Sequence, residues 1–495
     1  MMRLGALLRV TKMTMMRETM PRPTDTPPVG LALAGLALAM GLASLGSSVA
    51  NVALPTLMEA FGAPFQAVQW VVLAYLLAST TLIVSVGRLG DLLDRRRLLL
   101  AGLALFAVAS LLCGAAQSLP LLIAARALQG VGAAVLLALS LALASEIVPR
   151  AMTGRAVGLL GTASAIGTAL GPSLGGILIA GFSWRAIFLV NVPVALAALL
   201  VAARWLPAPA RAAGTGQPRF DLVGTLLLAL TLGAYALAMT MGRGQFGARN
   251  VALLAAAIAG LALFVRIEAR AASPVIPLHL VHDPVLWGGL ALSTLVSTVM
   301  MATLVVGPFY LSRALGLAPA AVGMVMSVGP AVVALSGVPA GRLVDHLGTT
   351  RLAMPALAAM LGGALLLAVI PASAGILGYL AGIVVTTLGY ALFQTANTTA
   401  VMQDVPPDQR GARSGLLNLS RNLGLITGAS VLGAVFALAA GASDLAAAPP
   451  EAVAQGMRIA FLVAAALLAV ALGVAAVSRG PALRASALPP ARHPR

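Results

Sequence analysis

The chain has 495 residues, of which 60% are hydrophobic and 9% are charged, and its mean hydropathy is +1.00. Soluble domains carry about 25% charged residues, so this composition excludes a soluble globular protein and indicates an integral membrane protein. The net charge of +17 comes from arginines in short blocks between apolar stretches, a spacing that favours membrane topology over nucleic-acid binding.

Residues 1–28 are polar and contain five basic side chains, which predicts a cytoplasmic tail. Fourteen apolar segments follow, each near the ~20 residues that a membrane-spanning helix needs. Their approximate limits are 29–55, 66–88, 98–117, 121–146, 155–181, 186–206, 221–242, 250–268, 285–313, 320–338, 353–371, 375–402, 411–440 and 456–478.

The basic residues test this count, because cytoplasmic segments of membrane proteins are enriched in Lys and Arg. With the N-terminus inside, 24 of the 31 basic residues fall in cytoplasmic segments, five fall outside, and Arg126 and Arg421 lie within spans. If one span were removed from the count, every later loop would move to the other side of the membrane and this asymmetry would disappear. We therefore expect both termini on the cytoplasmic side of the inner membrane, with Arg421 near the cytoplasmic mouth.

Two short charged stretches repeat one another. The stretch from Gly87 to Arg97 reads GRLGDLLDRRR, and the stretch from Gly341 to Arg351 reads GRLVDHLGTTR. Neither can lie in hydrocarbon, so each predicts a water-side hairpin between two spans, and the repetition predicts a duplicated bundle. An aspartate there can pair with arginines or a helix N-terminus and lock the halves together. The predicted gating residues are Gly87, Asp91, Arg95, Arg96, Gly341, Asp345 and Arg351.

A second repeat locates an insertion between the halves. The segments from Pro149 to Gly171 and from Pro406 to Gly428 match at an offset of 257, which is more than six spans require. Two extra spans therefore lie in the middle. The predicted organisation is a tail at 1–28, a six-helix bundle at 29–206, a linker with two extra helices at 207–284, a second six-helix bundle at 285–478, and a cytoplasmic tail at 479–495.

With these motifs in this order, the chain resembles the major facilitator superfamily, in its fourteen-span drug/proton antiporter branch. The loop motif at 87–97 carries the resemblance together with RALQGVGAA in the fourth span, GTALGPSLGG in the fifth, WRAIFLVNVP at 184–193 and FDLVG at 220–224. Asp94 departs from the family, which usually has glycine there. The resemblance implies an all-α major facilitator fold with 14 transmembrane helices, and transport by alternating access.

The fourth span contains Arg126, which would cost at least ~2.5–3.5 kcal/mol at the bilayer centre and should face the cavity with a partner. Gln129 lies at i+3, on the same face, and can hydrogen-bond it. The resemblance implies a role for Arg126 in proton transfer or substrate interaction. The alternative is a structural arginine bound to backbone carbonyls.

The fifth span contains a ridge of small residues, which allows close helix contact, and a proline that predicts a kink. The resemblance implies that this motif sets antiporter behaviour. Its residues are Gly167, Gly171, Pro172, Gly175 and Gly176.

Polar side chains within apolar spans either bridge helices or contact substrate. The candidates for the substrate cavity are Asn51, Tyr75, Tyr390, Gln394, Asn397, Asn418 and Asn422.

One family feature is missing. The first-span motif normally has an aspartate where this chain has Gly46, and none of the 14 acidic residues is predicted at the midplane. A cavity whose one charge is positive should disfavour cations and favour neutral or anionic solutes. Proton coupling would then depend on Asp91, on Glu146 at the inner end of the fourth span, or on the substrate itself.

We therefore expect a monomeric secondary transporter that exports amphipathic, drug-like molecules and interacts with lipids and protons. The alternative within transport is a lipid, cell-envelope precursor or metabolite exporter. A non-transporting sensor would need a soluble domain, for which no segment qualifies. The single lysine, Lys12, excludes a phosphate-binding GK[ST] loop, and the four histidines lie outside the spans. We expect no enzyme activity, cofactor, metal or nucleic-acid partner.

Overall fold

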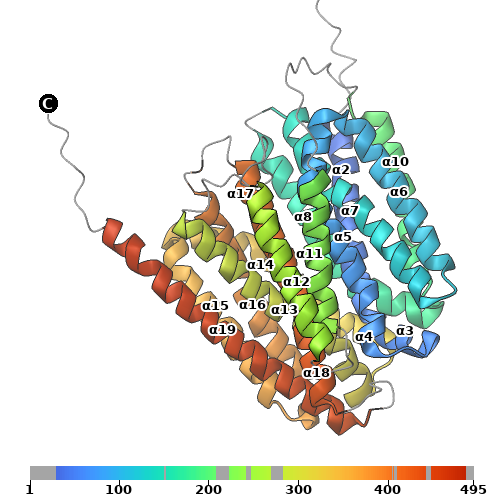
Figure 1. Ribbon diagram of the computed structural model, residues 1–495, viewed down its shortest axis with the longest axis vertical. Coiled ribbons are helices and arrows are strands. Elements are labelled where there is room, and N and C mark those ends of the chain that lie inside the picture. Colours follow the sequence, from blue (N-terminus) through green and yellow to red (C-terminus); the bar gives the residue numbers. More distant parts are fainter. Residues whose placement is uncertain are drawn as a thin grey trace, which may run out of the picture.

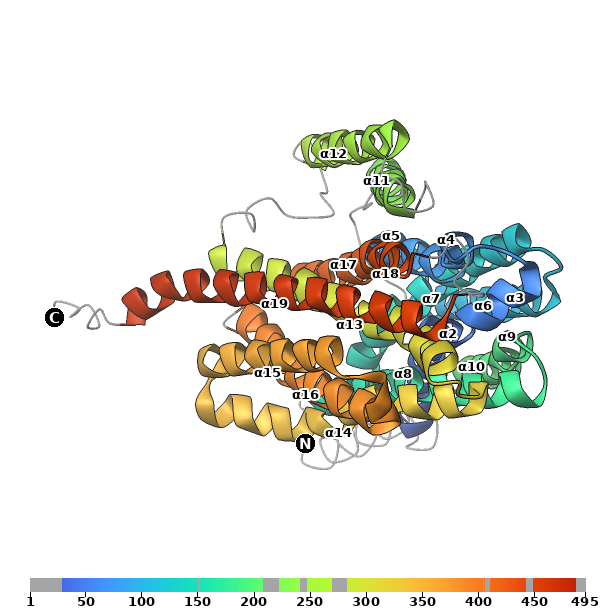
Figure 2. The same cartoon turned by 90° about the horizontal axis from the view of Figure 1, so that it is seen from below.

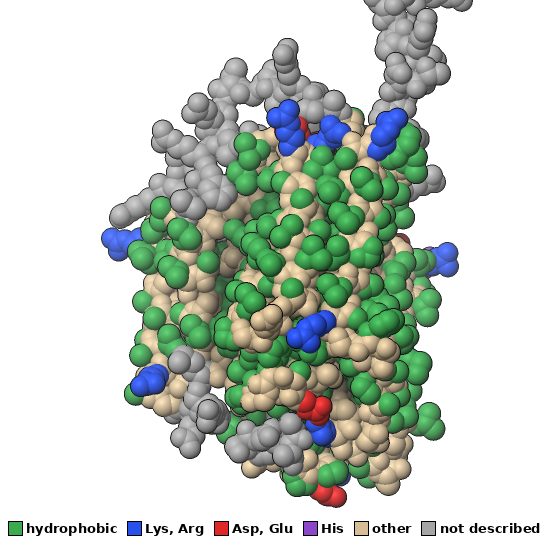
Figure 3. Space-filling view, turned by 90° about the vertical axis from the view of Figure 1, so that its right-hand side faces the viewer, with side chains coloured by type: hydrophobic (Ala, Val, Ile, Leu, Met, Phe, Trp, Pro, Cys, Tyr) green, Lys and Arg blue, Asp and Glu red, His purple; other side chains and the backbone are tan. Residues whose placement is uncertain are grey.

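A computed structural model describes residues 29–149, 152–207, 222–240, 247–268, 283–403, 405, 410–441 and 448–486. In these ranges, 14 helices are long and apolar enough to cross a membrane. This confirms the predicted all-α membrane fold. The side surface in Figure 3 is largely hydrophobic, and large apolar side chains such as Leu335 and Leu377 are almost fully exposed, as a lipid-facing surface requires.

The first half of the chain forms one bundle, blue to blue-green in Figure 1. Its elements are α2 (Val29–Val52), α3 (Leu54–Phe61), α4 (Phe65–Val68), α5 (Trp70–Leu92), α6 (Arg95–Ala115), α7 (Leu119–Ile147), α8 (Thr153–Gly181), α9 (Ala186–Leu189) and α10 (Asn191–Trp205). The short helices α3, α4 and α9 lie at one end of the long ones, which is called the opposite side below. The terminal side is the one at which α2 begins and α19 ends.

The second half forms another bundle, yellow to red in Figure 1. Its elements are α13 (Pro284–Phe309), η3 (Tyr310–Ala314), α14 (Pro319–Leu347), α15 (Thr349–Val369), η4 (Ala372–Ala374), α16 (Gly375–Met402), α17 (Arg410–Thr427), η5 (Gly428–Leu432), α18 (Gly433–Ala439) and α19 (Pro450–Ser486). The helix α19 continues beyond residue 478, where a tail was predicted. The domain boundaries remain predictions.

The two halves repeat the same packing of glycines. Gly167 and Gly171 in α8 contact α2 so closely that a Cβ on either would clash with it. Gly424 and Gly428, their counterparts at an offset of 257, contact α13 in the same way. In each half the fifth helix therefore packs on the first through the same two small residues, which explains why this stretch of sequence repeats.

The remaining pair, α11 (Leu222–Thr240) and α12 (Ala248–Glu268), lies outside both bundles, beside α5 and α17 (Figure 2). Hydrogen bonds join α11 to each half: Trp70 Nε1 donates to Thr240 Oγ1 at 3.1 Å, and the Tyr235 hydroxyl donates to Thr427 Oγ1 at 3.1 Å. The pair thus covers the seam between the halves on one face of the molecule.

The first charged hairpin is tighter than predicted. The helix α5 continues to Leu92 and α6 begins at Arg95, so only two residues form the turn. Asp94 caps α6, with its Oδ1 accepting from the backbone N–H groups of Arg96 at 2.9 Å and Arg97 at 3.4 Å. The departure from the family's glycine thus supplies a helix N-cap. Most of the predicted loop is helix that extends beyond the apolar span, because helical hydrogen bonds form equally well outside the membrane.

Candidate functional site

A cavity of about 290 Å³ lies between the two halves. One wall comes from α2, α5 and α8, and the other from α13, α14, α16 and α17. Its lining residues are Ser47, Ser48, Asn51, Leu76, Gly161, Ser164, Ala165, Thr168, Met300, Met301, Thr303, Leu304, Met326, Gly329, Pro330, Val333, Tyr379, Ile383, Thr387, Tyr390, Gln394, Arg421 and Leu425.

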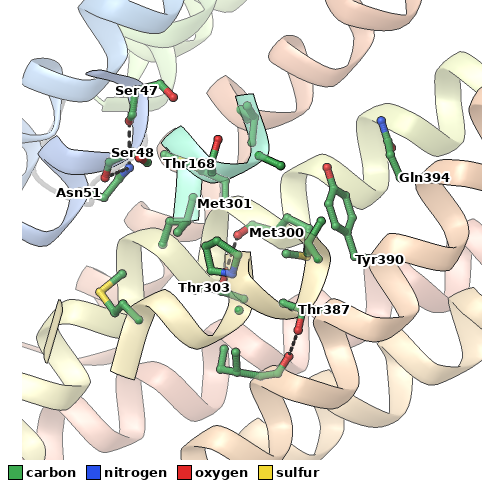
Figure 4. Close-up of a pocket in the computed structure, with 18 of the residues that line it drawn as sticks. Ser47, Ser48, Asn51, Thr168, Met300, Met301, Thr303, Thr387, Tyr390 and Gln394 are labelled. Carbon is green, nitrogen blue, oxygen red and sulfur yellow. Dashed lines mark hydrogen bonds between the residues drawn. The ribbon is translucent and has the colours of Figure 1, made fainter. Parts of the chain in front are cut away.

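The lining is mainly apolar, with polar groups at separate points. Figure 4 shows Ser47, Ser48 and Asn51 on one side, Tyr390 and Gln394 on the other, and methionine and threonine side chains of α13 between them. Methionine is flexible and polarisable, so it adapts to apolar groups of different shape. Such a surface suits amphipathic molecules of varied structure.

On the opposite side the halves are in close contact. The aromatic rings of Phe65, from the first half, and Phe309, from the second, meet edge to face at 5.3 Å. Gly176 of α8 lies so close to Gly323 of α14 that a Cβ on Gly176 would come within 2.9 Å of the Gly323 Cα. The side chains of Glu59 and Arg313 form an ion pair between α3 and η3. The cavity is therefore closed at this end.

On the terminal side each described ion pair lies within one half. Among the described residues, the ion pairs here join Arg95 to Glu146 and Arg97 to Asp94 in the first half, and Arg413 to Asp283, at 2.8 Å, in the second. A Cβ on Gly337, in the part of α14 towards this side, would meet nothing within 4 Å. The structure is therefore open towards the terminal side.

Three of the seven predicted cavity residues, Asn51, Tyr390 and Gln394, line the cavity, and four do not. Tyr75 lies inside the first half, where its hydroxyl donates to the Ala43 carbonyl at 2.6 Å. Asn397 lies inside the second half, where its amide donates to the Gly289 carbonyl at 3.0 Å. The other two are half-buried residues of α17 outside the lining, Asn418 and Asn422. Tyr75 and Asn397 thus join neighbouring helices of one half in this conformation, and their contact with substrate stays a prediction.

Asn51 has unused hydrogen-bonding capacity in the cavity wall. Its Nδ2 donates to the carbonyls of Ser47 at 3.2 Å and Ser48 at 3.3 Å, which fixes the orientation of the amide. Its Oδ1 has no partner, although the residue is only 1% exposed. A buried acceptor without a donor is costly, so a donor that reached this oxygen from the cavity would stabilise it.

Arg421 of α17 is the charged side chain in the described lining. No hydrogen bond or ion pair joins its guanidinium to a residue of the described ranges. The sequence indicated an arginine within this span but placed it at the mouth of the protein rather than in the cavity wall.

Arg126 does not line the cavity in this conformation, contrary to the prediction, and is completely buried within the first half. Its Nε donates to the Val71 carbonyl at 2.9 Å, and its Nη1 donates to Gln129 Oε1. Its Cζ lies 4.2 Å from the centre of the Tyr75 ring, a cation–π contact. The predicted partner Gln129 is present, and in turn donates to Ser110 Oγ at 2.7 Å.

The position of the missing family aspartate is also inside the first half. A Cβ on Gly46 would lie 3.0 Å from the Phe106 ring and 3.4 Å from the Tyr75 hydroxyl. That hydroxyl belongs to the ring beneath Arg126, whose Nη2 has no hydrogen-bond partner in the described structure. Glycine therefore leaves the buried guanidinium without a carboxylate on this side.

The predicted gating residues are only partly described. Gly87 and Asp91 lie in α5, but their side-chain surroundings are outside the described part of the structure. Arg95 pairs with Glu146, and Arg96 Nη2 donates to the Ala203 carbonyl at 2.5 Å. The second copy contributes Gly341 in α14, Asp345 and Arg351, of which the two charged side chains are exposed. Their gating role remains a prediction.

The fifth-span motif packs on two neighbours. Gly167, Gly171 and Gly175 face α2, and a Cβ on Gly175 would lie 2.7 Å from Val52 Cγ1. Gly176 and the carbonyl of Pro172 face Gly323 of α14, in the other half. The motif thus contributes both to the packing of its own half and to the closed end of the cavity.

The comparisons with known proteins agree with this architecture. The family model of the Major Facilitator Superfamily matches residues 36–429. The chain belongs to the Major Facilitator Superfamily. It is therefore a membrane transporter of small molecules and not an enzyme.

This major facilitator is similar to curated transporters with different names. It is 33% identical over 413 residues to the multidrug resistance protein Stp of Mycobacterium tuberculosis, covering 82% of this chain and 76% of that protein. It is 29% identical over 407 residues to the riboflavin transporter RibZ of Clostridioides difficile, covering 82% of this chain and 88% of that protein. The family is therefore established, and these names differ in substrate.

The solved structure of a bacterial homologue of the human lysosomal transporter Spinster, in an inward-facing and unoccupied conformation, matches this major facilitator with a TM-score of 0.69. The match covers 95% of this chain and 100% of that one at 17% sequence identity, so it supports the fold alone.

Proposed function

We propose that this protein exports amphipathic, drug-like small molecules by alternating access of its two six-helix halves, in exchange for protons. The observation that carries the proposal is the cavity between the halves, which has an adaptable lining of methionines and hydroxyls and is closed at one end only. The relative named as a multidrug resistance protein supports the same substrate class.

The orientation in the membrane follows from the charge distribution. By the positive-inside rule, the terminal side with its blocks of arginine faces the cytoplasm of the inner membrane, together with both termini. The structure then represents the state that loads substrate from the cytoplasm or from the inner leaflet. A monomer suffices for this cycle, because the cavity is built from one chain.

Proton coupling has few candidate groups. The described cavity lining contains no Asp, Glu or His. Glu146 pairs with Arg95 at the terminal side, and Asp91 lies near the end of α5. We propose that these carboxylates, or a titratable group of the substrate, couple export to the proton gradient, while Arg126 supports coupling from within the first half.

The second candidate is export of a metabolite, a lipid or a cell-envelope precursor on the same scaffold. The relative named as a riboflavin transporter supports it, because that name denotes a metabolite. Both candidates use the same cavity and the same cycle, so substrate screening separates them.

The test is transport into inverted membrane vesicles, combined with a susceptibility panel of the deletion strain covering drugs, dyes and envelope stress. Increased susceptibility to several unrelated drugs, together with drug uptake into vesicles that collapses when a protonophore is added, is the expected result. Envelope defects alone favour the second candidate, and absence of any uptake contradicts both.

Permanently cationic dyes such as ethidium should be exported poorly. The one charge in the described lining is the guanidinium of Arg421, which repels a cation in a cavity of low polarity. Ethidium efflux from energised cells, compared between the deletion strain and the complemented strain, measures this. Strong efflux that depends on the proton gradient would refute the prediction.

A further inference from the structure

The position of Arg421 in α17 is unusual for an arginine. The helix begins at Arg410 on the terminal side, so Arg421 lies 11 residues further on, about 16 Å along the axis at ~1.5 Å per residue. The apolar span of this helix begins at Leu416, so Arg421 lies five residues, about 7–8 Å, inside it. Charged side chains at this depth usually pair with another group or mark a functional site.

Two other arginines show what a structural role looks like in this protein. Arg413, on the same helix, pairs with Asp283 at 2.8 Å and donates to the Val401 carbonyl at 3.3 Å. Arg126 binds a backbone carbonyl and a glutamine and lies over an aromatic ring. Arg421 has no such partner in the described structure, and its side chain is exposed in the wall of the cavity.

A second group in the same cavity also lacks a partner. The Oδ1 atom of Asn51, from the other half, is buried and accepts no hydrogen bond, while its Nδ2 is engaged twice. The apolar side chains of Met300, Met301 and Leu304 line the same cavity. The cavity therefore offers one positive group, the unpartnered amide oxygens of Asn51 and Gln394, and an apolar surface.

We propose that the cavity binds amphipathic organic anions, with Arg421 as the residue that determines charge specificity. The guanidinium pairs with a carboxylate or sulfonate of the substrate, Asn51 Oδ1 accepts from a hydroxyl or N–H group, and the apolar body contacts the methionines. A planar guanidinium binds such anions with two parallel hydrogen bonds, which a lysine ammonium cannot reproduce. This inference rests on the proposed export function and specifies its substrate class.

Two dyes with the same xanthene core and opposite charge provide the test. Fluorescein is anionic and rhodamine 123 is cationic at neutral pH, so their difference in affinity reports charge preference at nearly constant shape. Saturable binding of each dye to the purified full-length protein is measured by fluorescence anisotropy for the wild type, Arg421→Gln, Arg421→Lys and Arg266→Gln. Arg266 is exposed on α12, away from the cavity lining, and is the matched control for loss of one positive charge.

We expect the wild type and Arg266→Gln to bind fluorescein in preference to rhodamine 123. Arg421→Gln should weaken fluorescein binding about tenfold, the size of one lost charge-assisted hydrogen bond, and should leave rhodamine binding equal or stronger. Arg421→Lys should keep the preference for the anion with reduced affinity. Thermal unfolding close to that of the wild type would show that the variants are folded.

Equal binding of both dyes by the wild type, a stronger preference for rhodamine, or no saturable fluorescein binding would overturn the inference. An unchanged ratio of the two affinities in Arg421→Gln would overturn the role of that residue. Failure of the export proposal is separate, because it is measured by transport and drug susceptibility. If the protein exports drugs but shows no charge preference, the export proposal stands and the proposal of anion binding fails.

Discussion

The interior of the first half is organised around one charged residue. Arg126 is fully buried, yet its Nη2 atom has no partner in the described structure, and the carboxylate expected from the family is replaced by Gly46. The ring of Tyr75 and the carbonyl of Val71 supply the electron-rich groups that stabilise the cation. Such a centre links α5 and α7 and makes their relative position sensitive to this one side chain.

Replacement of Arg126 by alanine should abolish export while the amount of protein in the membrane stays near normal. The substitution removes the charge and the bonds to α5, whereas the surrounding helices keep their apolar packing. Arg126→Lys should also lose at least ~90% of export, because an ammonium cannot reproduce the planar contacts of a guanidinium. Vesicle transport at matched protein abundance measures both, with Arg266→Ala as control. Wild-type export by both variants would mean that the residue serves packing only.

At this scale the sequence shows which spans carry polar residues, but not where those side chains point. Polar residues within apolar spans can be recognised from the sequence, and Asn51, Tyr390 and Gln394 do line the cavity. Tyr75 could not be separated from them, because a helix that is apolar on all sides has no face that marks the cavity. The place of Arg421 in the cavity wall was not predicted either, although α17 carries many polar residues along one face. Which neighbour a polar side chain meets depends on helix packing, which is not encoded locally.

At the scale of helices, α8 shows how small residues determine structure. A Cβ at Gly171 would clash with the Ser48 hydroxyl of α2, whereas a Cβ at Gly158 on the same helix would meet nothing within 4 Å. The sequence predicted the ridge, and Gly161, earlier on the same helix, has open space beside it and lines the cavity. The same spacing of glycines recurs in the fifth helix of the second half, and this repetition made the ridge recognisable in the sequence.

Gly171→Ala should therefore destabilise the protein and Gly158→Ala should not. The overpacked contact between α8 and α2 should cost about 1–3 kcal/mol, whereas alanine at an open helical position should be neutral or slightly stabilising. The midpoint of thermal unfolding in detergent, together with abundance in the membrane, measures the difference. Equal midpoints for the two variants would contradict the close packing of α8 on α2.

The ends of the helices were predicted less well than their number. The helices α5 and α14 continue to Leu92 and Leu347, past the apolar segments, and a residue with φ of +82°, Gly348, forms the turn that follows α14. Hydropathy reports where hydrocarbon ends, while a helix ends where its backbone is capped or turned. These two positions differ by several residues in this protein.

At the scale of the whole molecule, the closed end of the cavity depends on contacts between the halves. The ion pair between Glu59 and Arg313 is one such contact, and it is partly exposed, so it should contribute no more than ~1 kcal/mol. Its loss should shift the balance between the two access states rather than prevent transport.

Glu59→Gln should accordingly make the cavity up to about fivefold more accessible from the opposite side. The rate at which a membrane-impermeant maleimide added outside cells labels Ser47→Cys, in a background without Cys113, measures this access. Glu451→Gln is the matched control, since Glu451 is an exposed carboxylate on the same side without an ion pair in the described structure. Equal labelling rates in the Ser47→Cys parent and in its Glu59→Gln and Glu451→Gln variants would exclude a role for the ion pair in closing the cavity.

The orientation in the membrane has its own test. Reporter fusions at Gln245, between α11 and α12, and after Arg495 should report periplasm and cytoplasm, respectively. The prediction follows from 14 spans and the excess of arginine on the terminal side. A cytoplasmic signal at Gln245 would be incompatible with it.

The single positive charge of the described cavity lining has an electrical consequence. An organic monoanion that leaves the cytoplasm moves with the inside-negative membrane potential, which contributes about 2.3 kcal/mol per elementary charge for every 100 mV. A proton entering in exchange moves charge in the same sense, so the two driving forces add. Export of a cationic solute would instead move positive charge against the membrane potential in every cycle. Selection of anions by Arg421 would therefore make export an electrically downhill process.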